Sequence, residues 1–569
     1  MKTILVTMGI IVGTTVGVTV FYNLYTRWDR NRAYRNRHTK TILAHRGDIR
    51  DMGGSVLART VTVYDIYMDC LVIKDSTYWD NNIHELAPFL AQKFPQRDTE
   101  QWQAYLQEGR AKGRCFVSIA KNLTEDEANE IKTFPVFELG PYKGGGIIQS
   151  REKRIYPNGE LARRTIGFIG TADTVKFGIE WDYNDWLKGT NGKAVVLYGR
   201  YEGNDVKKEI DSIHVEHGYD IVTTLDLERQ QMADSVLRKA MSANDDIESG
   251  CVIVMDVETG ALRVMVNLGR DSESGEIHET IADVINRQFE PGSLAKVLPL
   301  AAALEDGYIH SLDETIPTNH GLLEGFIRDA HIEDYEHTHG SKSISVIDGF
   351  SMSSNYVFAY IANKYYSDSV SSFDDHIKKY CGGTDFNIPE KYQSRRDVLT
   401  RSIGYNFTMT PLSVLTLYNT IANKGKKMRP YLVEYLDGEP PVVYGYGPDS
   451  LGQAMPAAVA DTLMRALKAV TKNGTGKALI DVYPRVAGKT GTSRVAFVKE
   501  GRGNDPYHDQ NGRTKSASAY VGIVPADDPA YSIICVLYSK PSFRTIYGSS
   551  APAYVVRDIV SGMYEYATF

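Results

Sequence analysis

The stretch Phe289-Glu-Pro-Gly-Ser-Leu-Ala-Lys296 joins a break in the chain to the start of an apolar helix. The Pro-Gly pair interrupts regular structure, and the apolar residues that follow predict a helix from Ser293 to about Glu305. Ser293 and Lys296 are three residues apart, so their side chains share one face of that helix. The sequence therefore brings a hydroxyl and an amine together at a helix N-terminus.

This pairing has the chemistry of an activated nucleophile. A serine hydroxyl attacks poorly until a base takes its proton, and a lysine can be that base only when it is neutral. Burial, a helix N-terminus and a second cation would each disfavour the charged lysine. The backbone amide of Ser293 could also stabilise a developing oxyanion. The S-x-x-K pattern recurs at Ser118–Lys121 and Ser150–Lys153, where surface polar residues explain it. For Ser293 taken alone, a capping serine with a solvated lysine is the alternative interpretation.

A second short motif, Ser353-Ser-Asn355, lies 60 residues after Ser293. The Ser353 hydroxyl could relay a proton, and the Asn355 amide could hold a substrate backbone. S-x-N also occurs at Ser242–Asn244, so a turn or a helix cap is the alternative interpretation.

The third motif, Gly488-Lys-Thr-Gly-Thr-Ser493, follows an apolar pair that predicts a strand entering a site. Lys489 would place a positive charge near Lys296 and near a substrate carboxylate. Thr490 and Thr492 would donate hydroxyls to that carboxylate, and the amide of Thr492 would complete an oxyanion hole. Gly491 would let a substrate lie close to the strand. A glycine-bearing turn would explain this motif alone, whereas the ordered trio is typical of penicillin-binding proteins and β-lactamases.

The regions around the motifs predict a sheet built from both ends of one domain. A hairpin is expected from Cys251–Met255 and Ala261–Val266, and two more strands from Ser518–Val524 and Tyr531–Tyr538. The last helix is expected at Ala551–Tyr564.

Two folded domains are expected along the chain. Residues 40–215 form a mixed region with a strand over Val61–Met68 and an amphipathic helix over Glu100–Leu106. A boundary near Asp211–Gly218 separates it from residues 219–569, which contain all three motifs.

Composition excludes several classes of protein. Of 569 residues, 42% are hydrophobic and 24% charged, which is typical of globular proteins. The net charge of −7 disfavours a generally basic nucleic-acid binder. Five scattered cysteines form no C-x-x-C pair, which disfavours a disulfide scaffold or a structural zinc site. Cys251 and Cys535 lie in apolar runs and are expected to be buried thiols.

The N-terminal segment predicts a membrane anchor. Ile4–Tyr25 carries no charge, and as a helix it would measure roughly 33 Å, enough to cross a ~30 Å hydrocarbon layer. We therefore expect residues 1–26 to be an uncleaved single-span anchor, with a signal peptide or a buried core helix as alternatives. Six basic residues at positions 27–40 would place that flank in the cytoplasm by the positive-inside rule, so an exterior location of the larger domain needs other support.

Motifs along nearly the whole chain resemble those of class B penicillin-binding proteins, most closely the division-type branch in a form found in the Bacteroidota. The resemblance rests on the trio and on further stretches: Arg46–Asp51, Gly54–Ala58, Arg154–Gly159, Gly178–Glu180, Leu187–Gly189, Thr410–Leu412 and Tyr520–Ala526. Three positions depart from the family pattern. Met52 replaces a usual arginine, and Leu294-Ala295 replaces the usual threonine followed by a bulky residue.

The resemblance implies an α/β (α+β) transpeptidase domain, with a central antiparallel sheet flanked by helices, at residues 219–569. An elongated non-catalytic pedestal domain at 40–215 and one transmembrane helix would precede it. Ser293 would attack the penultimate D-Ala carbonyl of a peptidoglycan stem peptide, and the acyl-enzyme would pass to an amine of a neighbouring peptide. Lys296, Ser353, Asn355 and Lys489 would complete the catalytic set, and Thr490, Gly491 and Thr492 would bind substrate.

The resemblance also implies the surroundings of the enzyme. No metal or organic cofactor would be needed, and β-lactams would acylate the same serine. The expected setting is the inner membrane, with the catalytic domain in the periplasm beside a SEDS-type glycosyltransferase and other division proteins. A β-lactamase, a β-lactam sensor and a non-catalytic scaffold are the alternative functions.

Overall fold

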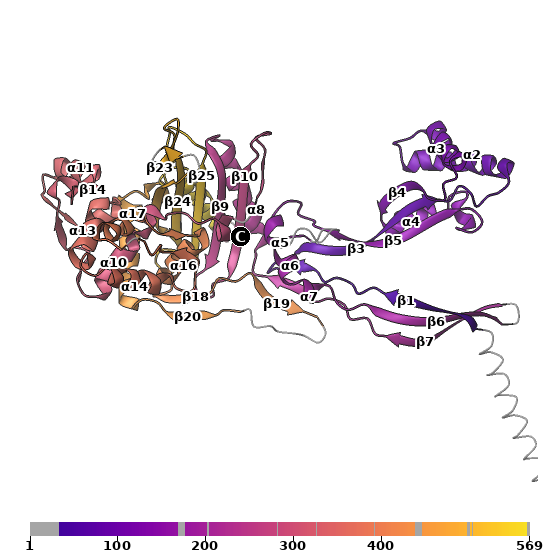
Figure 1. The fold of residues 1–569 in the computed structure, drawn as a ribbon, viewed down its shortest axis with the longest axis horizontal. Coiled ribbons are helices and arrows are strands. Elements are labelled where there is room, and N and C mark those ends of the chain that lie inside the picture. Colours follow the sequence, from indigo (N-terminus) through magenta and orange to yellow (C-terminus); the bar gives the residue numbers. More distant parts are fainter. Residues whose placement is uncertain are drawn as a thin grey trace, which may run out of the picture. The chain divides into compact units, whose positions relative to one another are not determined.

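The computed structural model describes residues 34–168, 177–201, 204–280, 283–325, 327–391, 393–438, 447–497, 501–502 and 505–565. By contacts these residues form two compact units (Figure 1). The N-terminal unit contains the described chain up to Asp48, Ala58–Pro157 and Lys188–Gly218, and the C-terminal unit contains the rest. Two segments expected in the first domain, Ile49–Leu57 and Asn158–Leu187, therefore group with the C-terminal unit. The expected anchor lies outside the described residues, and within those residues no helix is long and apolar enough to span a bilayer.

The N-terminal unit contains two antiparallel sheets and a small helical layer. One sheet has the order β1 (Tyr34–Ile42), β6 (Gly192–Tyr201), β7 (Asn204–Ile213). In the other, β3 (Val56–Met68) lies between β4 (Val117–Leu123) and β5 (Gly146–Ile155). The helical elements are α2 (Ser76–Lys93), α3 (Thr99–Ala111), α4 (Glu125–Ile131) and η1 (Phe137–Leu139).

Caps and a compact core explain why these helices form. The Asp98 and Thr124 side chains each begin a helix with a complete capping box, which satisfies backbone amides that a helix leaves free. The indole rings of Trp79 and Trp102 are almost fully buried in the apolar cluster between these helices and β3–β4.

The central sheet of the C-terminal unit has six antiparallel strands. In spatial order they are β11 (Ile277–Glu279), β10 (Leu262–Arg270), β9 (Ile247–Asp256), β25 (Tyr531–Ser539), β24 (Lys515–Val524) and β21 (Ala487–Val495). β9 pairs with β25, so the two ends of the domain meet in mid-sheet, as the sequence predicted. The third motif lies on β21, the last strand of this order.

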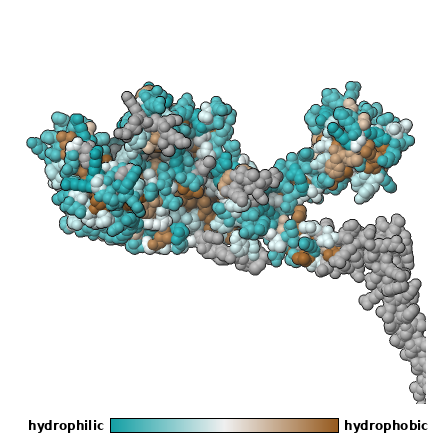
Figure 2. Space-filling model, viewed as in Figure 1, coloured by the Kyte–Doolittle hydropathy of each residue, from teal (hydrophilic) through white to brown (hydrophobic). Residues whose placement is uncertain are grey.

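Helices cover both faces of this sheet. Alternate residues of β9, β10 and β25 pack with α8 (Leu227–Ser242) and α18 (Ala551–Glu565) in one apolar core. On the other face, α16 (Pro411–Ala422) contacts β25, β24 and β9 and is buried at almost every position. The face of this unit seen in Figure 2 is mostly hydrophilic, with scattered apolar residues.

Further helices and strands complete the C-terminal unit. The helical ones are α5 (Arg163–Ile166), α6 (Ile179–Asp182), α7 (Asn184–Leu187), α9 (Asp283–Asn286), η2 (Gly292–Lys296), α10 (Val297–Glu305), η3 (Asn319–Gly321), α11 (Ala330–His339), α12 (Val346–Ser351), α13 (Asn355–Tyr366), α14 (Val370–Cys381), α15 (Arg395–Ser402), α17 (Ala457–Asn473) and η4 (Lys477–Leu479). The strands are β2 (Ile49–Arg50), β8 (Asp220–Thr223), β12 (Thr315–Pro317), β13 (Leu322–Leu323), β14 (Ile327–Arg328), β15 (Ser343–Ser345), β16 (Phe386–Asn387), β17 (Thr408–Met409), β18 (Lys426–Met428), β19 (Val433–Asp437), β20 (Ser450–Gln453), β22 (Gly501–Arg502) and β23 (Asp505–Asp509).

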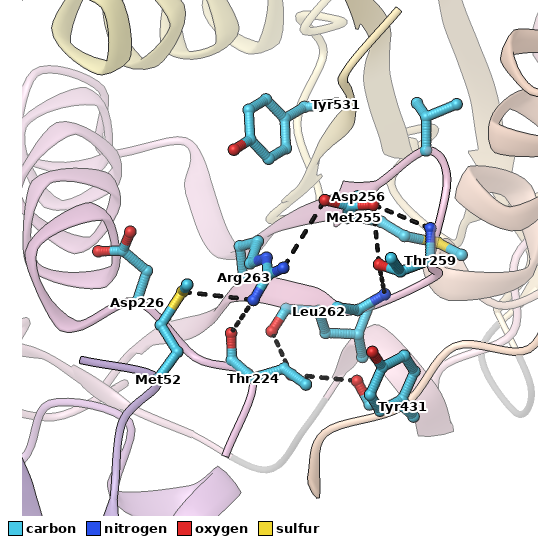
Figure 3. A network of polar contacts seen from close by, with 12 residues as sticks. Met52, Thr224, Asp226, Met255, Asp256, Thr259, Leu262, Arg263, Tyr431 and Tyr531 are labelled. Carbon is cyan, nitrogen blue, oxygen red and sulfur yellow. Dashed lines mark hydrogen bonds and ion pairs between the residues drawn. The ribbon is translucent and has the colours of Figure 1, made fainter. Parts of the chain in front are cut away.

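A polar network ties the segment after β2 to the β9–β10 hairpin (Figure 3). The Arg263 guanidinium donates to the Met52 sulfur at 3.3 Å and to the Thr224 carbonyl at 3.3 Å. A carboxylate oxygen of Asp256 lies 3.7 Å from the same guanidinium. The sequence left open which residue a methionine at position 52 would contact. In the structure, Met52 contacts Arg263 of β10.

Most elements expected from the sequence are present. The hairpin, the two C-terminal strands, the last helix and the helix near residue 100 lie within a few residues of their predicted bounds. Cys251 and Cys535 are buried free thiols, as expected. The helix expected from Ser293 differs at its start, because Gly292–Lys296 forms a 3-10 turn before the α-helix begins at Val297. Such turns are frequent at helix N-termini.

Candidate active site

The turn that carries Ser293 is held by close backbone packing. Gly292 has φ +53° and donates its N–H to the Gly404 carbonyl at 3.0 Å. Gly404 has φ +90°, and a Cβ there would lie only 1.9 Å from the Gly292 carbonyl oxygen. Since only glycine fits such an approach, the residue pair fixes where the turn begins. Ser293 follows it and is partly exposed.

Lys296 lies beneath Ser293 and is fully buried. Its Nζ is 3.0 Å from Ser293 Oγ and 3.2 Å from Ser353 Oγ, and it also donates to the Ser353 carbonyl. The hydrogen-bond partners of this amine are thus oxygens of uncharged groups. The S-x-x-K spacing and the tertiary fold together put the amine within proton-transfer distance of the hydroxyl.

Ser353 connects the two lysines of the site. Its backbone has φ +63°, which is a left-handed conformation. In a non-glycine residue this conformation costs on the order of 1–3 kcal/mol of strain. Lys489, fully buried on β21, donates to Ser353 Oγ at 2.8 Å. The structure therefore brings Ser293, Lys296, Ser353 and Lys489 into one chain of contacts, although 196 positions separate the first from the last.

Burial controls the protonation of both lysines. It lowers the pKa of Lys296 to about 7, although the negative charge of Asp329 opposes this shift. Burial and the neighbouring Lys296 lower the pKa of Lys489 well below its ordinary value. Two buried amines that share one hydroxyl disfavour a doubly charged state. A neutral Lys296 is accordingly accessible near neutral pH.

The other residues of the third motif lie on β21 with three different environments. Thr490 is buried, and its hydroxyl is 2.7 Å from that of Thr475. The Thr492 hydroxyl accepts the N–H of Gly548 at 3.0 Å. A Cβ on Gly491 would lie 2.6 Å from the Leu294 side chain. The Leu294 side chain thus occupies the place where a Cβ at position 491 would stand, which explains how leucine is accommodated after Ser293. That Gly491 lets a substrate lie close to the strand stays a prediction.

Asn355 is the first residue of α13, and its side chain is exposed. It lies two residues beyond Ser353, so the same chain segment presents both of the predicted second-motif residues. The four contacting side chains described above do not include it.

Sequence reasoning missed three residues that hold this site. Asp329, which is 3% exposed, accepts hydrogen bonds from Ser354 and from the Tyr356 N–H. The Tyr418 hydroxyl of α16 donates to the Leu294 carbonyl at 2.8 Å. Glu290, just before the Pro-Gly break, accepts from the Tyr507 hydroxyl at 2.7 Å. Asp329 has a helix-cap signature in the sequence, but its partner residues lie too far along the chain to be inferred from it.

This arrangement can carry out nucleophilic acyl chemistry. A neutral Lys296 can accept the Ser293 proton across 3.0 Å, and the Ser353 hydroxyl links that amine to Lys489. Among the residues that the structure describes, no group of three or more His, Cys, Asp and Glu side chains is placed to hold a metal ion.

Two protein families match the chain. The family described as Penicillin binding protein transpeptidase domain matches residues 250–561, which is more than half of the chain. The family described as Penicillin-binding Protein dimerisation domain matches residues 41–223.

Individual proteins show the same likeness. The chain is 26% identical to the Peptidoglycan D,D-transpeptidase FtsI of Escherichia coli (strain K12), over 93% of this chain and 85% of that protein. It is 24% identical to the Probable peptidoglycan D,D-transpeptidase PenA of Neisseria meningitidis, over 96% and 88%. In fold it is similar to Penicillin Binding Protein 2X from Streptococcus thermophilus, with a TM-score of 0.69, 21% identity and coverage of 93% and 80%.

Proposed function

This chain belongs to the class B penicillin-binding proteins, the peptidoglycan D,D-transpeptidases that act through a serine, and on that premise we propose that it cross-links stem peptides during septal cell-wall synthesis. The observation that carries the catalytic part is the contact chain Ser293–Lys296–Ser353–Lys489. The septal role rests on the likeness along the chain to the division-type branch, including FtsI.

In the first half-reaction, Ser293 Oγ attacks the carbonyl carbon of the penultimate D-Ala. Lys296, neutral at the start, takes the hydroxyl proton as the C–O bond forms. The backbone N–H groups of Ser293 and Thr492 stabilise the oxyanion of the tetrahedral intermediate. The C–N bond then breaks, and the leaving D-Ala amine takes the proton from Lys296 through the Ser353 hydroxyl.

The second half-reaction reverses these proton movements with a different amine. The acceptor amine of a neighbouring stem peptide attacks the acyl carbonyl and gives up a proton through the same relay. The ester bond to Ser293 breaks, its oxygen regains a proton, and an amide cross-link is released. Asn355 binds the backbone of the donor peptide, while Lys489, Thr490 and Thr492 bind its terminal carboxylate, with Gly491 shaping the strand between them.

The proposed setting is the inner membrane. Residues 1–26 anchor the chain, residues 40–215 form the pedestal, and residues 219–569 work in the periplasm. A SEDS-type glycosyltransferase that makes the glycan strand is the proposed membrane partner, together with other division proteins. No cofactor is required by this scheme, since every step uses a side chain or a backbone amide.

A covalent labelling experiment tests the catalytic proposal. We expect the full chain, purified in detergent, to form a slowly decaying adduct with a fluorescent penicillin, because its β-lactam carbonyl would acylate Ser293. Ser293→Ala should remove the labelled band, whereas Ser118→Ala, in one of the two other S-x-x-K stretches, should keep it. A band that forms and clears within seconds would instead indicate a β-lactamase. A folded protein without a band would indicate a scaffold.

The septal role has its own test. Depleting the protein should block division and give filamentous cells, and a fluorescent fusion should concentrate at midcell. Rounded cells and a dispersed fusion would assign the enzyme to wall elongation. A stable penicillin adduct without any loss of cross-links on depletion would indicate a sensor.

A further inference from the structure

Asp329 occupies a place in the site that the reaction scheme does not use. It precedes α11, and its carboxylate is almost fully buried. One carboxylate oxygen accepts the Ser354 hydroxyl at 2.6 Å and the Tyr356 N–H at 3.0 Å. The other accepts the His331 N–H at 3.1 Å and lies 3.2 Å from His331 Nδ1. One buried anion thus joins the N-termini of α11 and α13.

The helix geometry explains why an anion is stable there. The first amides of a helix lack intrahelical partners, and the helix dipole favours a negative charge at this end. Burial alone would raise the pKa of Asp329, but the hydrogen bonds from His331, Ser354 and Tyr356, with the charge of Lys296, hold it well below its usual value. The carboxylate is therefore ionised at neutral pH.

Ser354 passes this restraint to the catalytic loop. It is fully buried, donates to Asp329 and accepts the Val357 N–H at 3.1 Å as the cap of α13. Its backbone N–H bonds to the Gly349 carbonyl, while Ser353 N–H bonds to Phe350. The left-handed Ser353 lies between these two fixed points.

We propose that Asp329 is the positioning residue for Ser353: by clamping α11 to the start of α13, it holds Ser353 in the strained conformation whose carbonyl and hydroxyl both meet Lys296. The negative charge of Asp329 also favours the protonated form of Lys296, so its removal should lower the pKa of this amine further. This inference rests on the proposed acyl-transfer function. Among the described residues, the Lys489 amine of β21 and the His331 imidazole of α11 also interact electrostatically with this pair.

The test compares the penicillin acylation rate of the full-length wild type with that of Asp329→Asn, over a range of pH. We expect the plateau rate to fall by about 100-fold, the effect of misplacing a reacting group by roughly 1 Å. We also expect the acid limb of the pH–rate profile, where the rate falls as the pH drops, to move to lower pH. The reason is that removing the negative charge lowers the pKa of Lys296. If the plateau acylation rate and the position of the acid limb both equalled those of the wild type, the proposal would be overturned.

Two further variants separate positioning from general stability. Ser354→Ala cuts the link to the loop but keeps the Asp329 charge, so its plateau should fall while its acid limb stays at the wild-type pH. Asp226→Asn removes a carboxylate that caps α8 at 3.0 Å from the Arg229 N–H, away from this loop, and should leave both quantities unchanged. If Asp329→Asn fails to fold, an unchanged plateau in Ser354→Ala would overturn the proposal. A wild type that is never acylated would refute the proposed function itself.

Discussion

Two regions of the C-terminal unit bury positive charge in opposite ways. Between α14 and α15, the fully buried guanidinium of Arg401 meets the carboxylate of Asp374, which is 4% exposed. Around Ser293, the amines of Lys296 and Lys489 meet hydroxyl and carbonyl oxygens instead. The first arrangement matches a cation with an anion, and the second leaves two cations to compete for neutral acceptors.

The difference teaches how one fold separates stability from reactivity. A matched buried pair keeps both groups charged, and breaking it leaves an uncompensated charge. An unmatched buried amine lowers its free energy by losing its proton, so burial lowers the pKa of Lys296 to about 7. The same burial that would weaken the fold therefore prepares a base.

The largest expected effect tests the reactive region. Lys296→Met should slow penicillin acylation about 1,000-fold, within the range for removing a general base. The midpoint temperature of thermal unfolding should stay the same or rise. The pKa of Lys296 is lower in the folded protein than in the unfolded chain, so the charged lysine is unfavourable in the native state.

Lys427→Met is the matched control for that change. Lys427 is also buried, with its pKa lowered by burial, but it donates to the carbonyls of Lys379 and Gly382. Acylation kinetics of both variants are compared in one assay. An equal loss in the two variants would mean that any buried lysine supports the fold needed for acylation, and the contrast between the regions would fail.

The next effect tests the matched region. Arg401→Met should lower the free energy of unfolding by about 3–5 kcal/mol, because it leaves Asp374 buried and unpaired. The double variant Arg401→Met/Asp374→Leu should recover most of that loss. Chemical denaturation followed by tryptophan fluorescence measures both, and a double variant as unstable as the single one would contradict the pairing argument.

A pH profile sharpens the comparison without any substitution. Since Lys296 must be neutral to accept the serine proton, the acylation rate should fall as pH drops through about 7. Each further pH unit should cost about tenfold, so the rate at pH 5 should be on the order of 100-fold below the plateau. Stability should rise with pH between about 7 and 10.5, where only the unfolded lysine still holds its proton. A flat profile from pH 5 to 8 would exclude Lys296 as the base.

The smallest effect concerns the support of the nucleophile turn. Tyr418→Phe removes the hydroxyl that donates to the Leu294 carbonyl and should cost about 1 kcal/mol of stability. Acylation should slow several-fold, because the turn that carries Ser293 loses a fixed point. Tyr105→Phe, which removes a similar bond to the Ser118 carbonyl in the N-terminal unit, should leave acylation unchanged. Equal rates in the Tyr418 variant and the wild type would show that backbone packing at Gly404 suffices.

Local pattern predicted much of the fold. Alternation and turn residues identified the β9–β10 hairpin and the β24 and β25 strands, because strand pleat and hairpin turns are set by neighbours in sequence. The grouping of Ile49–Leu57 and Asn158–Leu187 with the C-terminal unit could not be found in this way, since it depends on contacts with distant strands and helices. The segment of the expected anchor lies outside the described residues, so its role stays a prediction.

By itself, the sequence determined which chemistry is available and where it begins on the chain. The three-residue spacing of Ser293 and Lys296 and the Lys-Thr-Gly strand follow from local periodicity, which short-range sterics enforce. Only the tertiary structure decided that Asp329 restrains Ser353, that Leu294 fills the space beside Gly491, and that Lys296 is buried deeply enough to lose its proton. Those outcomes depend on desolvation and on contacts between residues tens to hundreds of positions apart, which no local pattern encodes.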